Sequence, residues 1–209
     1  GDSLETAWAR FARPIVDFVE YNGVEGGSVP VGDLRVEADL DLPSASSAAC
    51  VRLVEGGGDV PGMGPPPAVY EVQIETRLDA SGRPDRRVRL LVNGRQAGEA
   101  ALSRAARVRL GFWNADDAVG VSIDGRTVIE QSFDIPPDSA PARSTGSGVA
   151  VGAQGAPLRV ARLRLWRDTY YRDLGSAAGR GAEEIAISEH GYFMLGDNSR
   201  SSQDSRMWG

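Results

Sequence analysis

Side chains suited to hydrogen-bonded chemistry are concentrated in the last nineteen residues, 191–209. Gly196-Asp197-Asn198 follows an apolar run and predicts a turn, because these residue types adopt turn conformations readily. The next eight residues hold four serines, two arginines and Asp204. An Asp204–Arg206 ion pair could be bidentate and hold the loop in one conformation. The alternative is an exposed, serine-rich tail, which the composition alone favours equally.

The order of these residues resembles the C-terminal conserved box of bacterial type I signal peptidases, which are serine endopeptidases of the inner membrane. We call residues 196–206 the terminal box; its matching positions are Gly196, Asp197, Asn198, Ser202, Asp204, Ser205 and Arg206. The resemblance implies supporting roles. Ser202 would hydrogen-bond and orient a catalytic lysine, and a salt bridge between Asp204 and Arg206 would fix the loop that carries it. Gly196 and Asp197 would form the turn.

The catalytic groups of that family are missing from this chain. The family uses a Ser-Lys dyad, in which a desolvated, neutral lysine removes the proton of the serine. All 23 basic residues here are arginine, and the Ser-Met pair of the family's nucleophile motif does not occur. We therefore expect the chain alone not to be a peptidase, and we assign no catalytic residue and no cofactor within it.

The rest of the chain resembles the large insertion that some signal peptidase I-like proteins, of the planctomycete type, carry before this box. The resembling stretches are residues 13–23, 110–117, 123–125 and 163–171. This resemblance implies a location on the extracytoplasmic (periplasmic) side of the bacterial inner membrane, within a membrane-anchored parent protein. The implied partners are the parent's catalytic core and membrane anchor, and exported preproteins.

Alternating apolar and polar residues predict an all-β fold. The run from Leu34 to Leu42 alternates in this way, which gives a strand one buried and one wet face. Asn93-Gly94 and Asp124-Gly125 favour type I′ turns, so each predicts a two-residue hairpin. The alternation of apolar and polar residues shifts by one position near Ala161, which predicts a β-bulge. About ten antiparallel strands between residues 30 and 170 indicate a two-sheet sandwich, similar to concanavalin- or laminin-G-like jelly rolls.

The predicted organisation has four parts. Residues 1–28 form a helical or irregular lead-in, because Trp8, Phe11, Ile15 and Phe18 recur at helical spacing, with Pro14 expected to kink the helix. Residues 29–171 form the sandwich, residues 172–184 a linker, and residues 185–209 the signal peptidase segment. Gly1 stands where an initiator methionine would be, which suggests part of a longer protein.

Composition excludes several classes of function. The formal net charge is −6, whereas nucleic-acid binding needs a cationic face, so no nucleic-acid partner is expected. A single cysteine and a single histidine argue against a cysteine or histidine metal site. No apolar run approaches the roughly 20 residues that cross a bilayer, and no signal peptide opens the chain.

Several residues allow two interpretations. Asn114, Asp116 and Asp117 could supply oxygen ligands to calcium, but a polar turn explains the same residues and is preferred. Trp113 and Trp166 could stack on sugar rings, although core packing is preferred for tryptophans within apolar strands. Cys50 reads as a buried, inert thiol and His190 as a turn or strand-edge residue. The remaining expectation concerns five arginines that should lie on a solvent-exposed sheet face: Arg86, Arg87, Arg89, Arg107 and Arg109.

Two functional hypotheses follow, together with a plain structural spacer as a third. The first is a non-catalytic, extracytoplasmic part of a signal peptidase I-like serine endopeptidase. The second is a carbohydrate- or peptide-binding sandwich in which the terminal box is a relic, with a glycan as its partner. A fold alone does not decide between them.

Overall fold

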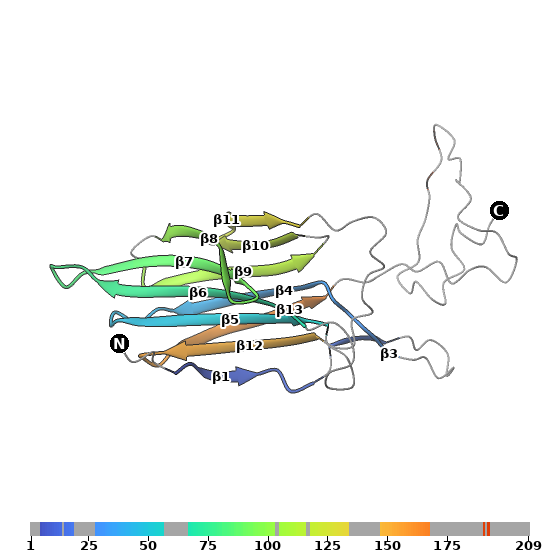
Figure 1. Ribbon diagram of the computed structural model, residues 1–209, viewed down its shortest axis with the longest axis horizontal. Coiled ribbons are helices and arrows are strands. Elements are labelled where there is room, and N and C mark those ends of the chain that lie inside the picture. The colour runs from blue at the N-terminus through green and yellow to red at the C-terminus, as the bar shows by residue number, and fades with distance from the viewer. Residues whose placement is uncertain are drawn as a thin grey trace, which may run out of the picture. The chain divides into compact units, whose positions relative to one another are not determined.

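The structure, a computed structural model, describes residues 5–13, 15–18, 28–56, 67–102, 105–115, 118–133, 147–167, 190 and 192. The chain divides into two units, one comprising Gly1–Val16 with Pro30–Asp168 and the other Asp17–Val29 with Thr169–Gly209. The first unit contains a β-sandwich (Figure 1). Within the described part of the chain, no helix is both long and apolar enough to span a membrane.

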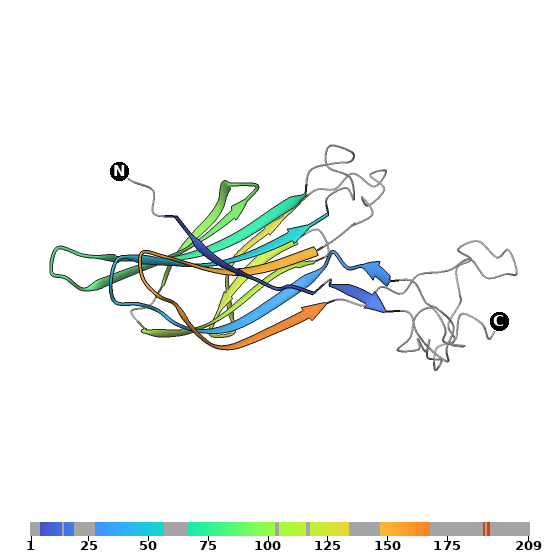
Figure 2. The ribbon, with the colours of Figure 1, turned by 90° about the horizontal axis from the view of Figure 1, so that it is seen from below.

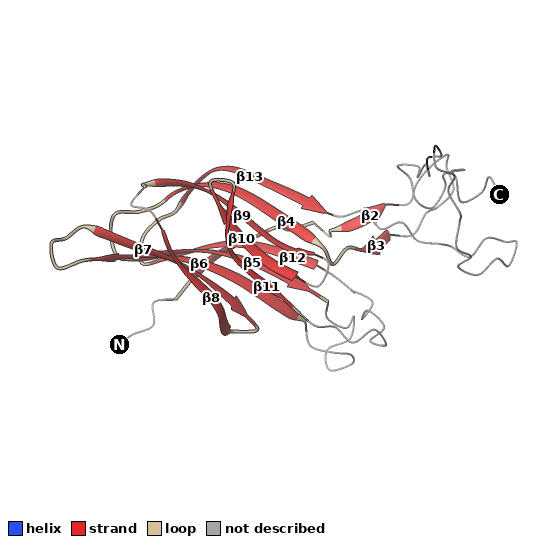
Figure 3. Cartoon of the chain, turned by 90° about the horizontal axis from the view of Figure 1, so that it is seen from above, coloured by secondary structure: helices blue, strands red, loops and turns tan. Residues whose placement is uncertain are grey.

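The sandwich consists of two antiparallel sheets, so the predicted fold class is confirmed. One sheet has six strands in the order β1-β12-β5-β6-β7-β8, and the other has five in the order β11-β10-β9-β4-β13 (Figure 3). The six strands are β1 (Ala7–Arg10), β12 (Ser147–Gln154), β5 (Ser47–Glu55), β6 (Ala68–Leu78), β7 (Pro84–Val92) and β8 (Arg95–Leu102). The five are β11 (Arg126–Ser132), β10 (Ala118–Ile123), β9 (Arg107–Ala115), β4 (Leu34–Asp41) and β13 (Arg159–Arg167). Two short strands, β2 (Val16–Phe18) and β3 (Ser28–Pro30), pair in a separate sheet.

The core lies between the two sheets and follows the alternation in the sequence. In β4, Val36, Ala38 and Leu40 are fully buried, whereas the residues between them reach the outer surface. The facing sheet supplies buried side chains such as Val51 and Leu53. Burying each large aliphatic side chain contributes about 1.5–3 kcal/mol, which makes this core the main stabilising element.

Turn chemistry sets the register of two hairpins as predicted. Asn93 and Gly94 have φ values of 50° and 76°, and Asp124 and Gly125 have values of 52° and 82°. Positive φ at both central positions is what a type I′ turn requires, so both predicted hairpins are confirmed. The predicted bulge is also present, since the pairing of β13 with β4 shifts between Val160 and Arg162.

The expected helix near the N-terminus is wrong. Residues 7–10 form β1, which pairs with β12 from Ala7↔Ala153 to Arg10↔Ala150. The amide of Phe11 then donates to the carbonyl of Val149 at 2.9 Å. The neighbouring strand therefore satisfies this backbone, and tertiary pairing overrides the helical spacing of the aromatic residues.

One of the five arginines predicted to be on a wet face is buried. Arg86 is 2% exposed and faces inward from β7, where its guanidinium donates to the Thr76 hydroxyl and to the Pro43 carbonyl. Burial lowers the pKa of Arg86. Its position follows from the β7 pleat, which places Arg86 on the same face as Val88 and Leu90. Arg87, Arg107 and Arg109 are on outer faces as expected, and Arg89 is partly covered there.

Candidate functional site

The terminal box lies outside the described residues. This applies to Gly196, Asp197, Ser202, Asp204 and Arg206, and also to Asp116 and Asp117 of the calcium hypothesis. Of the neighbouring segment the structure describes His190, which lies in a turn, and Tyr192, which is 87% exposed. The roles assigned to the terminal box by resemblance therefore remain predictions.

Asn114 connects the two sheets from a buried position. Its side chain, 4% exposed, donates from Nδ2 to the Gly32 carbonyl at 2.9 Å and to Oε2 of Glu55 at 3.1 Å. The Tyr70 hydroxyl donates to the same Glu55 oxygen at 3.3 Å. The nitrogen of Asn114 thus faces the acceptors, which is a bridge between β9 and β5 rather than a turn. Among the described residues, no group of three or more His, Cys, Asp and Glu side chains could hold a metal ion.

Trp113 and Trp166, the two tryptophans of the sugar-binding hypothesis, do not pack in the core. The preferred interpretation, core packing, is therefore wrong. Both lie on the outer face of the five-stranded sheet, where Trp166 pairs with Arg35, and Arg35 in turn pairs with Trp113. Trp166 is 52% exposed. The Arg35 guanidinium lies over the Trp113 ring, 5.4 Å from its centroid. The pleat explains this placement, because Phe112 takes the inward position that Trp113 would need.

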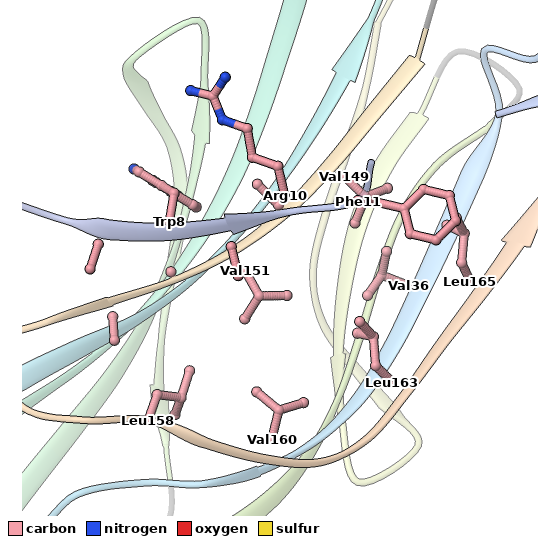
Figure 4. Close-up of a pocket in the computed structure, with 15 residues that line it drawn as sticks. Trp8, Arg10, Phe11, Val36, Val149, Val151, Leu158, Val160, Leu163 and Leu165 are labelled. Atoms are coloured by element: carbon pink, nitrogen blue, oxygen red, sulfur yellow. The ribbon is translucent and has the colours of Figure 1, made fainter. Parts of the chain in front are cut away.

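At one edge of the sandwich, β1 and β12 of one sheet lie near β13 of the other (Figure 2). Side chains of these strands and of Val36 line a groove between the two sheets. We call it the edge groove; its volume is about 710 Å³. Figure 4 shows Arg10 pointing away from it, so the side chains that face it are apolar. They include Phe11, Val149, Val151, Leu158, Val160, Leu163 and Leu165. Phe11 and Leu163 remain 49% and 50% exposed although they line this hollow.

The sequence interpretation did not find the edge groove. Alternating apolar residues in β13 predict a strand with one face away from water, and nothing more. Whether that face is covered depends on where the opposite sheet ends. The sequence does carry one signal, because Arg162 and Arg164 alternate with Leu163 and Leu165 and such charges mark β13 as a strand at the surface.

Cys50 is a buried thiol, as predicted. It is 1% exposed, and burial together with the nearby Glu71 carboxylate raises its pKa to about 12. A thiol with so high a pKa is almost entirely protonated at neutral pH and is a poor nucleophile. Cys50 is therefore not a candidate catalytic group.

Comparison with protein families gives the relationship of the chain. The model of the family described as signal peptidase, peptidase S26, matches residues 86–209, which is more than half of the chain. The chain belongs to the signal peptidase family. The match begins in β7 and includes both the C-terminal strands of the sandwich and the terminal box. No curated protein sequence matches this signal peptidase family member.

The solved structures similar to this signal peptidase family member include an alginate lyase, a β-glucanase and a galectin. The PL7 alginate lyase AlyA1 of Zobellia galactanivorans matches with a TM-score of 0.42 and 10% identity over 66% of this chain and 63% of that one. The β-glucanase of Bacillus licheniformis matches with a TM-score of 0.38 and 15% identity, over 61% and 56% of the two chains. Sheep galectin-11 matches with a TM-score of 0.35 and 12% identity, over 75% and 99%. The matched region thus spans less than two thirds of the first two proteins.

Proposed function

We propose that this chain is an extracytoplasmic, non-catalytic part of a signal peptidase, and that it supports catalysis by residues located elsewhere in the parent protein. The observation that carries the proposal is the family match through the terminal box, in a chain that has no lysine. A Ser-Lys dyad cannot be completed from these residues. The parent would hydrolyse exported preproteins after small residues, on the periplasmic side of the membrane.

Ser202 is the residue through which the terminal box would act. A hydroxyl that donates a hydrogen bond to the amine of a buried lysine fixes its rotamer and favours its neutral form, because only the neutral amine has a lone pair to accept the bond. Asp204 and Arg206 would hold the loop, because a bidentate carboxylate–guanidinium pair has one preferred geometry.

A paired substitution in the full-length parent tests this role. The parent is reconstituted in membranes and its cleavage of a preprotein is measured for Ser202→Ala and for the adjacent Ser201→Ala. We expect Ser202→Ala to reduce the rate about a hundredfold, within the usual contribution of acid–base groups, and Ser201→Ala to leave it within about twofold. The 209-residue chain alone should cleave nothing. Equal rates for the two variants would remove Ser202 from the supporting role, and cleavage by the chain alone would remove the proposal.

A second candidate function, carbohydrate binding, is favoured by the row of Trp166, Arg35 and Trp113 on the outer sheet face. Half-exposed aromatic rings can stack on the apolar faces of sugar rings. A glycan array followed by calorimetric titration tests it, with Trp166→Ala as the variant. Binding that Trp166→Ala weakens at least tenfold supports this function, and the absence of any glycan ligand rejects it.

A further inference from the structure

The edge groove lies beside β13, the last strand of the five-stranded sheet; we call the side of β13 that faces away from β4 its free edge, because no described strand pairs there. The six-stranded sheet has one strand more than the five-stranded sheet, and within the described part of the chain no strand pairs with the edge of β13 that faces away from β4. Leu163 and Leu165 pair with Ala38 and Val36, whose side chains are fully buried, so both leucines point inward. Leu163 nevertheless stays 50% exposed. One strand added to β13 would make the sheets equal and cover these leucines.

On the outer face of the same edge, two rows of alternating charge contain one more arginine than aspartate each. Asp41 lies between Arg107 of β9 at 2.5 Å and Arg159 of β13 at 3.6 Å. Asp39 lies in the same way between Arg109 at 3.0 Å and Arg162 at 4.0 Å. Each of these two rows across β9, β4 and β13 therefore consists of an arginine, an aspartate and an arginine, and the last arginine lies at the free edge of β13.

The third row ends with Arg164, whose neighbouring carboxylate is already bound by another arginine. Arg164 stands opposite Glu37, but the Glu37 carboxylate is held by Arg35 at 3.0 Å. No carboxylate pairs with Arg164 among the residues that the structure describes. Because directly opposed charges of opposite sign stabilise adjacent strands, the next strand in all three rows should carry carboxylates.

We propose that the free edge of β13 binds an extended segment of another polypeptide, with apolar residues at alternate positions and acidic residues between them. The backbone of the segment would pair with β13, as in other cases of strand addition. Its apolar side chains would enter the edge groove against Phe11, Val151 and Leu163, and its acidic side chains would face Arg162 and Arg164.

Charge argues against a second copy of the chain as the occupant. Two β13 strands side by side would place arginines against arginines, which is unfavourable for directly opposed positions. A strand that only needs protection from pairing is usually blocked by charges pointing inward, whereas the inward positions along most of β13 are apolar (Val160, Leu163 and Leu165) and an arginine takes this face only at the last residue, Arg167. The pattern at this edge is therefore that of a strand that accepts a partner.

Synthetic peptides test the proposal on the full chain. The acidic peptide has nine residues, equal to the length of β13, with valine and glutamate in alternation. One control replaces each glutamate with lysine, and another has the acidic composition in two blocks instead of alternating. Fluorescence anisotropy of labelled peptides measures binding. We expect both controls to bind at least about tenfold more weakly than the acidic peptide. Non-specific attraction to a chain of net charge −6 would give the opposite preference.

Charge reversal then locates the site. The double variant Arg162→Glu/Arg164→Glu should bind the lysine peptide in preference to the acidic one, and Arg162→Gln/Arg164→Gln should bind both weakly. The matched control, Arg95→Glu/Arg126→Glu, changes the net charge equally at two exposed arginines on β8 and β11 and should keep the original preference. Hydrogen exchange should slow at residues 159–167 when the acidic peptide binds.

Several results would overturn the proposal. These are absence of binding, equal binding of acidic and lysine peptides, and an unchanged preference in the charge-reversed variant. Slow exchange, in the free chain, of the β13 amides that point away from β4 would also overturn it. Slow exchange that does not depend on protein concentration would identify a segment of the chain itself as the occupant, and protection that increases with concentration would identify a second copy.

Discussion

At the residue scale, the reactivity of Cys50 tests whether its thiol is inaccessible to solvent in the folded protein. With a pKa of about 12, raised first by burial and then by Glu71, only about one thiol in ten thousand is ionised at pH 8. We expect native protein to react with iodoacetamide only through unfolding, and unfolded protein to react at the rate of a free cysteine. The measurement is the labelling rate by mass spectrometry with and without urea. Fast labelling in the absence of urea would contradict the buried position.

Gly120 is required by the tryptophan that covers it. A Cβ atom added to Gly120 would lie 2.1 Å from Cζ2 of Trp113, so the indole ring would have to move and leave its position under Arg35. Gly120→Ala should therefore lower the free energy of unfolding by about 1–3 kcal/mol, which is the usual cost of overpacking. Urea unfolding monitored by tryptophan fluorescence measures it.

The matched control for this substitution is Gly148→Ala in β12. A Cβ atom there would meet Val54 at 3.6 Å, which is ordinary van der Waals contact, and its φ is not in the left-handed region. Its free energy of unfolding should stay within about 1 kcal/mol of the parent chain. If both alanine variants lose stability equally, the Trp113 contact is not the cause.

At the scale of the element, the rows of charge across β9, β4 and β13 make stability depend on pH. Hydrogen bonds from Arg109 and Arg107 hold the pKa values of Asp39 and Asp41 below their ordinary 3.8. The unfolded chain therefore binds protons more readily than the folded chain near pH 3–4. The stabilising contribution of these carboxylates is complete above about pH 5, one unit above their unfolded pKa, and is lost as the pH falls through their lowered pKa values.

The free energy of unfolding in urea, measured between about pH 6 and pH 3, should thus fall as the solution is acidified below about pH 5. In Asp39→Asn/Asp41→Asn this fall should be smaller, because two of the titrating groups are gone. High salt should also reduce it, since both carboxylates are at the surface. A double variant with the pH profile of the parent chain would show that other groups control the acid sensitivity.

The same elements show which structural features the sequence contains. The hairpins at Asn93-Gly94 and Asp124-Gly125 could be predicted because positive φ is a local requirement. β1 could not be predicted, since its backbone hydrogen bonds come from β12, more than 130 residues later in the chain. The burial of Arg86 and the exposure of Trp166 could not be predicted for a related reason: the pleat decides which face a side chain takes, but only the position of the other sheet decides whether that face is covered.

At the scale of the whole molecule, the two parts of the candidate function were predictable to different degrees. The terminal box could be recognised because seven of its eleven residues match the conserved box of the family in type and in order. The family match supports that relationship. The edge groove depends on two strands, β1 and β13, that belong to different sheets and lie far apart in sequence. No local pattern could bring them together.

The division of the chain into two units leads to a final prediction about stability. The first unit has an apolar core of its own between its two sheets, to which Leu40, Val51 and Leu90 belong. Because the apolar core dominates the free energy of folding, deletion of residues 169–209 should leave the free energy of unfolding of the sandwich within about 1 kcal/mol of the full chain. Deletion of residues 1–13 is the control, and it should lower stability clearly, because it removes β1 and uncovers the apolar side chains of β12. Urea unfolding followed by far-ultraviolet circular dichroism compares the three chains. If loss of residues 169–209 is as damaging as loss of β1, then the sandwich depends on the terminal segment, and the two cannot be separate functional modules.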